Sequence, residues 1–149
     1  MEIQLGDVSH IIQLAIAPVF LLTGVGTNLM VLTNRLSRII DRSRVVEERL
    51  HATGEPDPPQ YGPELTTLYK RAHLINRAIT LSTSCALLVC LVIATLFLGD
   101  ALDLKLAKLI ALLFVLAMMA LIGSFIYLLR EIFIATSTFY LHRIITPAK

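Results

Sequence analysis

Four arginines and one aspartate lie within ten consecutive residues and form the part of the sequence with the clearest chemistry. They are Arg35, Arg38, Asp41, Arg42 and Arg44. On a helix, Arg35, Arg38 and Arg42 share one face, because residues three and four apart are neighbours. Asp41 is spaced to pair with Arg38 or with Arg44. Two interpretations stay open: stacked basic rings that attract anions in a symmetric oligomer, or an anchor to anionic lipid.

A polar stripe leads into this cluster along the apolar segment that precedes it. At 100° per residue, one narrow sector contains His10, Gln13, Ala17, Gly24, Asn28, Val31, Arg35, Arg38 and Arg42. Unpaired polar groups are costly in hydrocarbon, so this face is expected to meet protein or water. Either Gly24 lets another helix approach while Asn28 hydrogen-bonds across, or the face lines a water-filled path in a homo-oligomer.

Two later apolar segments carry comparable faces of small and polar residues. The first contains Tyr69, His73, Asn76, Thr80, Thr83, Leu87, Cys90 and Ala94, and the second Ala120, Gly123, Ser124, Tyr127 and Glu131. Close helix packing explains both faces, and association with further copies of the chain would bury them. Arg35 and Arg77 are the possible partners of Glu131, and the sequence also allows that Glu131 pairs with neither.

The sequence offers little for catalysis, cofactor binding or metal binding. The four histidines are isolated and no paired cysteine ligands are present, so we expect no metal site. Cys85 and Cys90 lie five apart in an apolar run and point to different faces, which makes a disulfide between them unfavourable. We expect no enzyme, no cofactor and no binding of nucleic acid, since acidic residues alternate with the basic ones.

These residues must be positioned by helices that cross a membrane. The hydrophobic fraction of 56% is high and the charged fraction of 16% is low for a soluble chain of 149 residues. Three apolar segments have about the 20 residues that a membrane-spanning helix needs. We predict an all-α membrane protein with spans at about 11–33, 78–98 and 106–129, organised as a single domain 1–149.

The spans are expected to continue outside the membrane. Residues 34–77 predict a helical hairpin, because apolar positions keep a helical spacing up to a break at Gly54 and the following prolines. A new helix is then expected from Pro63, with Glu64 favourable in its first turn. Residues 130–146 predict a third helix that packs on the hairpin.

The distribution of Lys and Arg predicts the orientation. Eight of the thirteen basic residues lie in 34–77: Arg35, Arg38, Arg42, Arg44, Arg49, Lys70, Arg71 and Arg77. The segment before the first span has none, and the tail adds Arg130, Arg143 and Lys149. We therefore expect the hairpin and the C-terminus in the cytoplasm and the N-terminus outside.

Two sequence runs carry a resemblance to a known family. They are Ala17-Pro18-Val19-Phe20-Leu21-Leu22-Thr23-Gly24 and Asn34-Arg35-Leu36-Ser37-Arg38-Ile39-Ile40-Asp41-Arg42. The chain resembles a bacterial family of small multi-pass membrane proteins that is known only as a domain of unknown function. The resemblance implies a bacterial inner-membrane protein, and it supplies no catalytic or binding residues.

The working hypothesis is a homo-oligomeric channel for small ions, lined by the first helix and gated at its arginines. It rests on the polar stripe and the Arg-rich end lying on one face. The alternative is a non-conducting membrane scaffold or regulator that acts through a cytoplasmic helical bundle. In that case Arg35 and Arg38 would point at lipid headgroups or at acidic side chains. Expected partners are further copies, anionic lipid and, for the channel, small ions.

Overall fold

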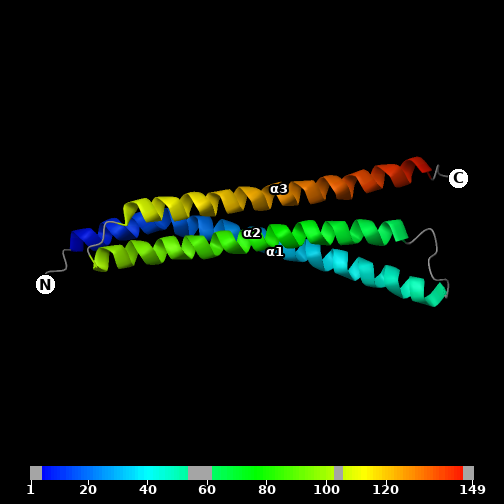
Figure 1. The fold of residues 1–149 in the computed structure, drawn as a ribbon, viewed down its shortest axis with the longest axis horizontal. Helices are drawn as coiled ribbons and strands as arrows, with labels where there is room; N and C mark the ends of the chain where they lie inside the picture. Colours follow the sequence, from blue (N-terminus) through cyan, green and yellow to red (C-terminus); the bar gives the residue numbers. More distant parts are fainter. Residues whose placement is uncertain (1–4, 54–61, 103–105, 146–149) are drawn as a thin grey trace. The chain divides into compact units, whose positions relative to one another are not determined.

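The residues that the structure describes form three long α-helices (Figure 1). The computed structural model describes the backbone of residues 5–53, 62–102 and 106–145, and the side chains of 12–52, 62–99, 102 and 106–136. The helices are α1 (Leu5–Thr53), α2 (Gly62–Ala101) and α3 (Ala107–Ile145). No strand occurs in these ranges, and the predicted all-α fold with three helices long and apolar enough to span a membrane is confirmed.

Each helix is longer than a bilayer is thick. At 1.5 Å per residue the 49 residues of α1 extend over roughly 70 Å, against about 30 Å of hydrocarbon. The apolar windows that qualify as membrane spans have mean hydropathies of 1.8, 2.5 and 2.8 in α1, α2 and α3. The apolar and charged segments of each helix therefore belong to one uninterrupted element. The break predicted at Gly54 lies outside the described residues.

The start of α2 follows from its first three residues. The helix begins at Gly62, and Pro63 occupies the first turn, where its missing N–H has no intrahelical partner to lose. Glu64, also in the first turn, places a negative charge at the positive end of the helix dipole. The helix predicted to begin here is present in the structure.

Buried positions recur every seven residues along each helix. They are Pro18, Val25, Leu32, Ile39 and Val46 on α1; Leu68, Ile75, Ser82 and Val89 on α2; and Ala117, Ser124 and Glu131 on α3. A second series on α2 contains Ala78, Cys85 and Val92. This repeat is typical of helices packed as in coiled coils, where the seven-residue spacing keeps one seam on the neighbouring helix.

The chain divides into two compact units, each built from all three helices. Unit 1 comprises Met1–Met30 and Thr80–Gly123, and unit 2 comprises Val31–Ile79 and Ser124–Lys149. The buried core of unit 1 is small and apolar: Val25, Cys85, Val89 and Ala117. The core of unit 2 is larger: Leu32, Ile39, Val46, Leu68, Ile75 and Ala78.

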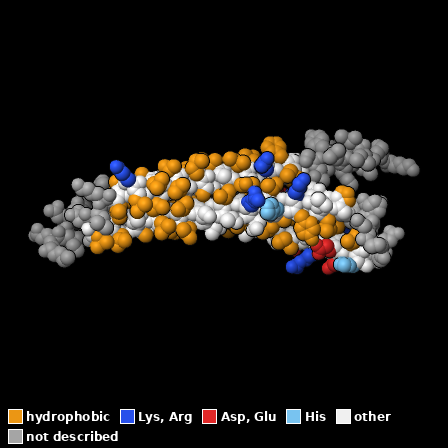
Figure 2. Space-filling view, in the orientation of Figure 1, with side chains coloured by type: hydrophobic (Ala, Val, Ile, Leu, Met, Phe, Trp, Pro, Cys, Tyr) orange, Lys and Arg blue, Asp and Glu red, His pale blue; other side chains and the backbone are white. Residues whose placement is uncertain are grey.

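Hydrophobic side chains cover much of unit 1 on the face that the space-filling view shows (Figure 2). On α3 these outward side chains are between 42% and 61% exposed: Leu109, Leu112, Val115, Leu116, Met119 and Ile122. A water-exposed surface rarely carries so continuous an apolar patch. The surface suits contact with lipid tails, in agreement with the three candidate spans.

Adjacent isoleucines on α1 provide a test of this packing. Ile39 is 4% exposed in the core of unit 2, whereas its neighbour Ile40 is 41% exposed. We expect Ile39→Ala to lower the free energy of unfolding by about 2–4 kcal/mol, because a cavity remains. Ile40→Ala should cost less than about 1 kcal/mol, since little buried surface is lost. Unfolding in mixed micelles measures both values, and equal losses would contradict the assigned face.

Candidate functional site

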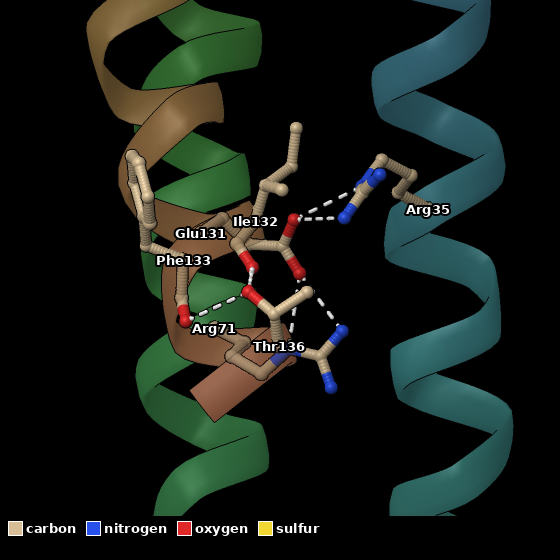
Figure 3. A network of polar contacts seen from close by, with 6 residues as sticks. All are labelled: Arg35, Arg71, Glu131, Ile132, Phe133 and Thr136. Atoms are coloured by element: carbon tan, nitrogen blue, oxygen red, sulfur yellow. Dashed lines mark hydrogen bonds and ion pairs between the residues drawn. The ribbon is translucent and has the colours of Figure 1, made fainter. Parts of the chain in front are cut away.

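A buried carboxylate on α3 binds arginines from both other helices of unit 2. The Glu131 side chain is fully buried, and Arg35 and Arg71 point toward it from α1 and α2 (Figure 3). Arg35 donates from Nε at 2.9 Å and from Nη2 at 2.5 Å to Oε2 of Glu131. Arg71 donates from Nε at 3.0 Å and from Nη2 at 2.8 Å to Oε1. We call these three residues the Glu131 clamp.

The seven-residue repeat places each residue of the clamp. Arg35 follows Asn28 by seven residues, Arg71 precedes Ala78 by seven, and Glu131 follows Ser124 by seven. Asn28, Ala78 and Ser124 are all buried, so the same helix faces carry the clamp inward. The clamp therefore occupies one layer of the helix packing in which charges replace apolar side chains.

Glu131 can remain charged in this layer because each of its oxygens has a guanidinium. An isolated carboxylate would be very costly to bury, and charge-assisted hydrogen bonds from two arginines offset that cost. The Arg35 and Arg71 side chains remain 33% and 23% exposed. Two positive charges and one negative charge leave a net positive charge at the clamp.

Thr136 lies beside the clamp but takes no part in it. Its hydroxyl donates to the backbone oxygen of Ile132 at 2.8 Å and to that of Phe133 at 3.2 Å, as Figure 3 shows. Both acceptors belong to the same helix. The Thr136 hydroxyl thus has its hydrogen-bond acceptors within its own helix, as is usual for threonine on a helix.

The clamp lies where the apolar sequence of each helix ends. Arg35 and Glu131 each follow a predicted span by two residues, and Arg71 precedes the second span by seven. Guanidinium groups beside this boundary can hydrogen-bond to a carboxylate without entering hydrocarbon. In unit 2 the clamp joins the three helices at this level.

A second group of contacts joins α1 to α2 in the predicted hairpin. Arg42 donates to Oε1 of Glu64 from Nε at 3.0 Å and from Nη2 at 2.7 Å, and both side chains are substantially exposed. Solvent screening makes such a pair weak. The Tyr69 hydroxyl donates to Glu47 at 2.8 Å, and this hydrogen bond and the carboxylate charge raise the pKa of Tyr69, which lies outside the apolar stretch 78–98.

Polar groups within the apolar segments are also paired. In unit 1, Asn28 Nδ2 donates to Ser82 Oγ at 2.8 Å, and in unit 2, Ser124 Oγ donates to the Ala78 backbone oxygen at 2.9 Å. Exposed Thr27 donates to the Thr23 carbonyl at 3.1 Å. No buried side-chain nitrogen or oxygen among the described residues lacks a partner. These groups are satisfied without water in hydrocarbon.

The polar stripe predicted on α1 divides in the structure. Asn28 is buried and Arg35 is partly buried against other helices of the chain, whereas Gln13, Gly24 and Arg38 are exposed. A Cβ built at Gly24 meets nothing within 4 Å, so no helix of the same chain uses the space beside it. Close approach of another copy there stays a prediction. The His10 side chain lies outside the described residues.

The predicted charge pairing is resolved in part. Arg35, one of the two possible partners of Glu131, binds it, and so does Arg71, which was not predicted. The other possible partner, Arg77, is exposed, as are Asp41 and Arg44. The spacing of Arg71 indicates that it faces inward, because it lies seven residues before Ala78 in the buried series that continues with Cys85 and Val92. Among the side chains described here, no three His, Cys, Asp or Glu residues group as metal ligands.

The Glu131 clamp yields a test with a matched control. Glu131→Gln leaves two guanidiniums beside a neutral amide, and we expect the free energy of unfolding to fall by about 3–5 kcal/mol. Arg44→Gln removes an exposed charge and should change it by less than about 0.5 kcal/mol. Unfolding in mixed micelles is the measurement, and a negligible effect of Glu131→Gln would refute the clamp.

Replacing the whole clamp with apolar side chains tests whether its ion pairs supply net stability. Arg35→Met, Arg71→Met and Glu131→Leu together remove all three charges of the clamp. Because desolvation offsets much of the attraction in a buried ion pair, we expect this triple variant to unfold within about 1 kcal/mol of the unaltered chain. A loss as large as that of Glu131→Gln would mean that the ion pairs themselves supply net stability.

Comparison with known proteins places this architecture in a family. A family model described as "Protein of unknown function (DUF2721)" matches residues 15–141, a range that contains the clamp and most of all three helices. No curated protein and no solved structure gives a significant match. The matched range covers most of the 149 residues. The chain therefore belongs to the DUF2721 family, whose function is unknown.

Proposed function

We propose that this chain is a non-conducting, non-enzymatic membrane scaffold or regulator, which acts through the helical bundle of unit 2. The proposal includes a place in the bacterial inner membrane, with the N-terminus outside and unit 2 on the cytoplasmic side. The Glu131 clamp is the observation that carries it. A bundle locked by buried charges presents a fixed surface to a partner.

Ion pairs within unit 2 favour the scaffold because they hold two of the three arginines that a basic ring would need. A basic ring at the mouth of a channel requires Arg35, Arg38 and Arg42 to face a common axis. Arg35 instead binds Glu131, and Arg42 binds Glu64. Arg38 alone of the three is without a carboxylate partner among the described residues. The attraction of the ring for anions is thereby weakened.

Hydrogen bonds between polar groups inside the chain also support an assembly without a water-filled channel. Asn28 and Ser82 bind each other in the core of unit 1, and the Ser124 hydroxyl binds a backbone carbonyl in unit 2. Neither group needs water. A helix face that lines a channel would instead aim its polar groups at a water-filled space.

The surface that unit 2 offers to a partner carries both signs of charge. Its exposed ionisable side chains include Asp41, Arg44, Glu48 and Lys70. Charges held on rigid helices favour specific association more than strong affinity. A partner with a complementary pattern of charges is therefore proposed.

A channel between copies is the second candidate, and exposure of part of the stripe favours it. Gln13, Gly24 and Arg38 face outward from α1, so a water path along them would require several copies around one axis. Such a path lies outside the single chain. It is compatible with the clamp, because these three outward residues are not part of the clamp.

Ion flux distinguishes the two candidates. Reconstituted protein is expected to pass no more chloride or potassium than empty liposomes do, because every buried side-chain nitrogen or oxygen among the described residues has a hydrogen-bond partner. A flux that Arg38→Gln reduces and Arg44→Gln leaves unchanged would instead establish the channel between copies. Unaltered unfolding of both variants in mixed micelles serves as the folding control.

Site-specific photo-crosslinking in cells tests the scaffold directly. A photoreactive residue at exposed Arg44 is expected to capture one discrete partner, whereas the same residue at Val46, which is 2% exposed, should capture none. Charge reversal at Glu48, one turn further on α1, should abolish that product. If Arg44 and other exposed positions of unit 2 capture nothing but lipid, the scaffold proposal fails.

A further inference from the structure

We propose that three exposed arginines of unit 2 bind the phosphate groups of anionic lipids. They are Arg38 of α1, Arg77 of α2 and Arg130 of α3, which we call the arginine belt. Each helix contributes one member. The inference is independent of the scaffold role, because lipid binding requires only that the chain spans a bilayer.

The belt lies at the ends of the apolar segments. Arg77 and Arg130 directly adjoin the predicted spans 78–98 and 106–129, and Arg38 follows the span 11–33 by five residues. Arginine has a long apolar stem, so its guanidinium can reach the headgroup layer from slightly different depths. All three side chains can therefore meet lipid phosphates.

Contacts within unit 2 indicate how far apart the belt members lie along the bundle. The contact between Arg35 and Glu131 places α1 at residue 35 beside α3 at residue 131, next to Arg130. The hydrogen bond from Ser124 to Ala78 places the position next to Arg77 beside residue 124 of α3. By the helix rise, the three Cα atoms fall within roughly 14 Å along the bundle.

Among the described residues, the belt arginines lack the carboxylate partner that three nearby arginines have. Arg35 and Arg71 bind Glu131, and Arg42 binds Glu64. No acidic side chain among the described residues contacts Arg38, Arg77 or Arg130. The net positive charge of the clamp adds to their attraction for anions. Guanidinium groups bind phosphate oxygens in a two-pronged geometry, which matches a lipid headgroup.

Apolar side chains beside Arg130 indicate a lipid rather than a free phosphate. Ile126, Leu129 and Phe133 of α3 are 52%, 54% and 71% exposed, and they lie within four residues of Arg130. A free anion would use only the guanidinium. A phospholipid uses both features, because its acyl chains cover the apolar side chains while its phosphate reaches the arginine.

The chain contains no tryptophan, so a single introduced tryptophan can report local lipid. Ile126→Trp places the reporter one turn from Arg130, and Leu112→Trp places a control at an equally outward position of α3, 56% exposed. Quenching by brominated phosphatidylglycerol is compared with quenching by brominated phosphatidylcholine in mixed bilayers. We expect a preference for phosphatidylglycerol of about fivefold or more at position 126 and near onefold at position 112.

Variants assign the preference to the belt. Arg38→Gln, Arg77→Gln and Arg130→Gln together should reduce the preference at position 126 to near onefold, whereas Arg44→Gln should retain it. The three corresponding Arg→Lys changes should retain part of it, because lysine keeps the positive charge but cannot bind phosphate in the two-pronged geometry. A preference near onefold in the chain with all arginines present overturns the proposal, and so does one that survives the triple glutamine change.

Inorganic phosphate distinguishes a free anion from a lipid. Added at constant ionic strength, it should leave the preference at position 126 unchanged, because the acyl chains contribute to binding. Loss of the preference on addition of inorganic phosphate would show that the belt takes the free anion, and would overturn the lipid assignment.

Discussion

The structure depends on a constraint of charge: a carboxylate buried between helices must have its positive partners beside it. Glu131 meets this constraint through Arg35 and Arg71, one from each neighbouring helix of unit 2. Because the partners come from different elements, all three helices must be present and aligned before the charge is compensated. The clamp thus makes the packing of unit 2 mutually dependent, which apolar contacts alone would not require.

The two units meet the demand for polar satisfaction in different ways. Unit 1 buries a neutral amide against a hydroxyl, Asn28 against Ser82, and exposes a largely apolar surface. Unit 2 buries a charged group and exposes charged side chains. This contrast matches the two surroundings of a membrane protein. Lipid tails offer no hydrogen bonds, so polar groups there must bind one another, whereas headgroups and water can solvate exposed charges. One repeating helix pattern therefore serves both environments.

Length, composition and charge placement were enough to predict the all-α fold and three helices able to span a membrane. They were not enough for the clamp. Gly24 and Asn28 lie four residues apart and so only about 40° apart around the helix, and the predicted stripe therefore combined inward Asn28 with outward Gly24. Arg71 was missed because charges in a basic segment normally face water, and only its spacing from Ala78 indicates otherwise. The pairing of Glu131 needed the third helix in place.

A strict seven-residue repeat is ambiguous about alignment, since a helix displaced by seven positions again offers apolar residues to its neighbours. The buried charge removes that ambiguity in unit 2. If α3 were displaced by one repeat, Ser124 would stand between the guanidiniums and Glu131 would lose both of its partners. Coiled coils use single buried polar residues in the same way to select one alignment. Glu131 thus favours the one alignment of α3 in which it meets both arginines. It disfavours displaced alignments that hydrophobic burial alone would allow.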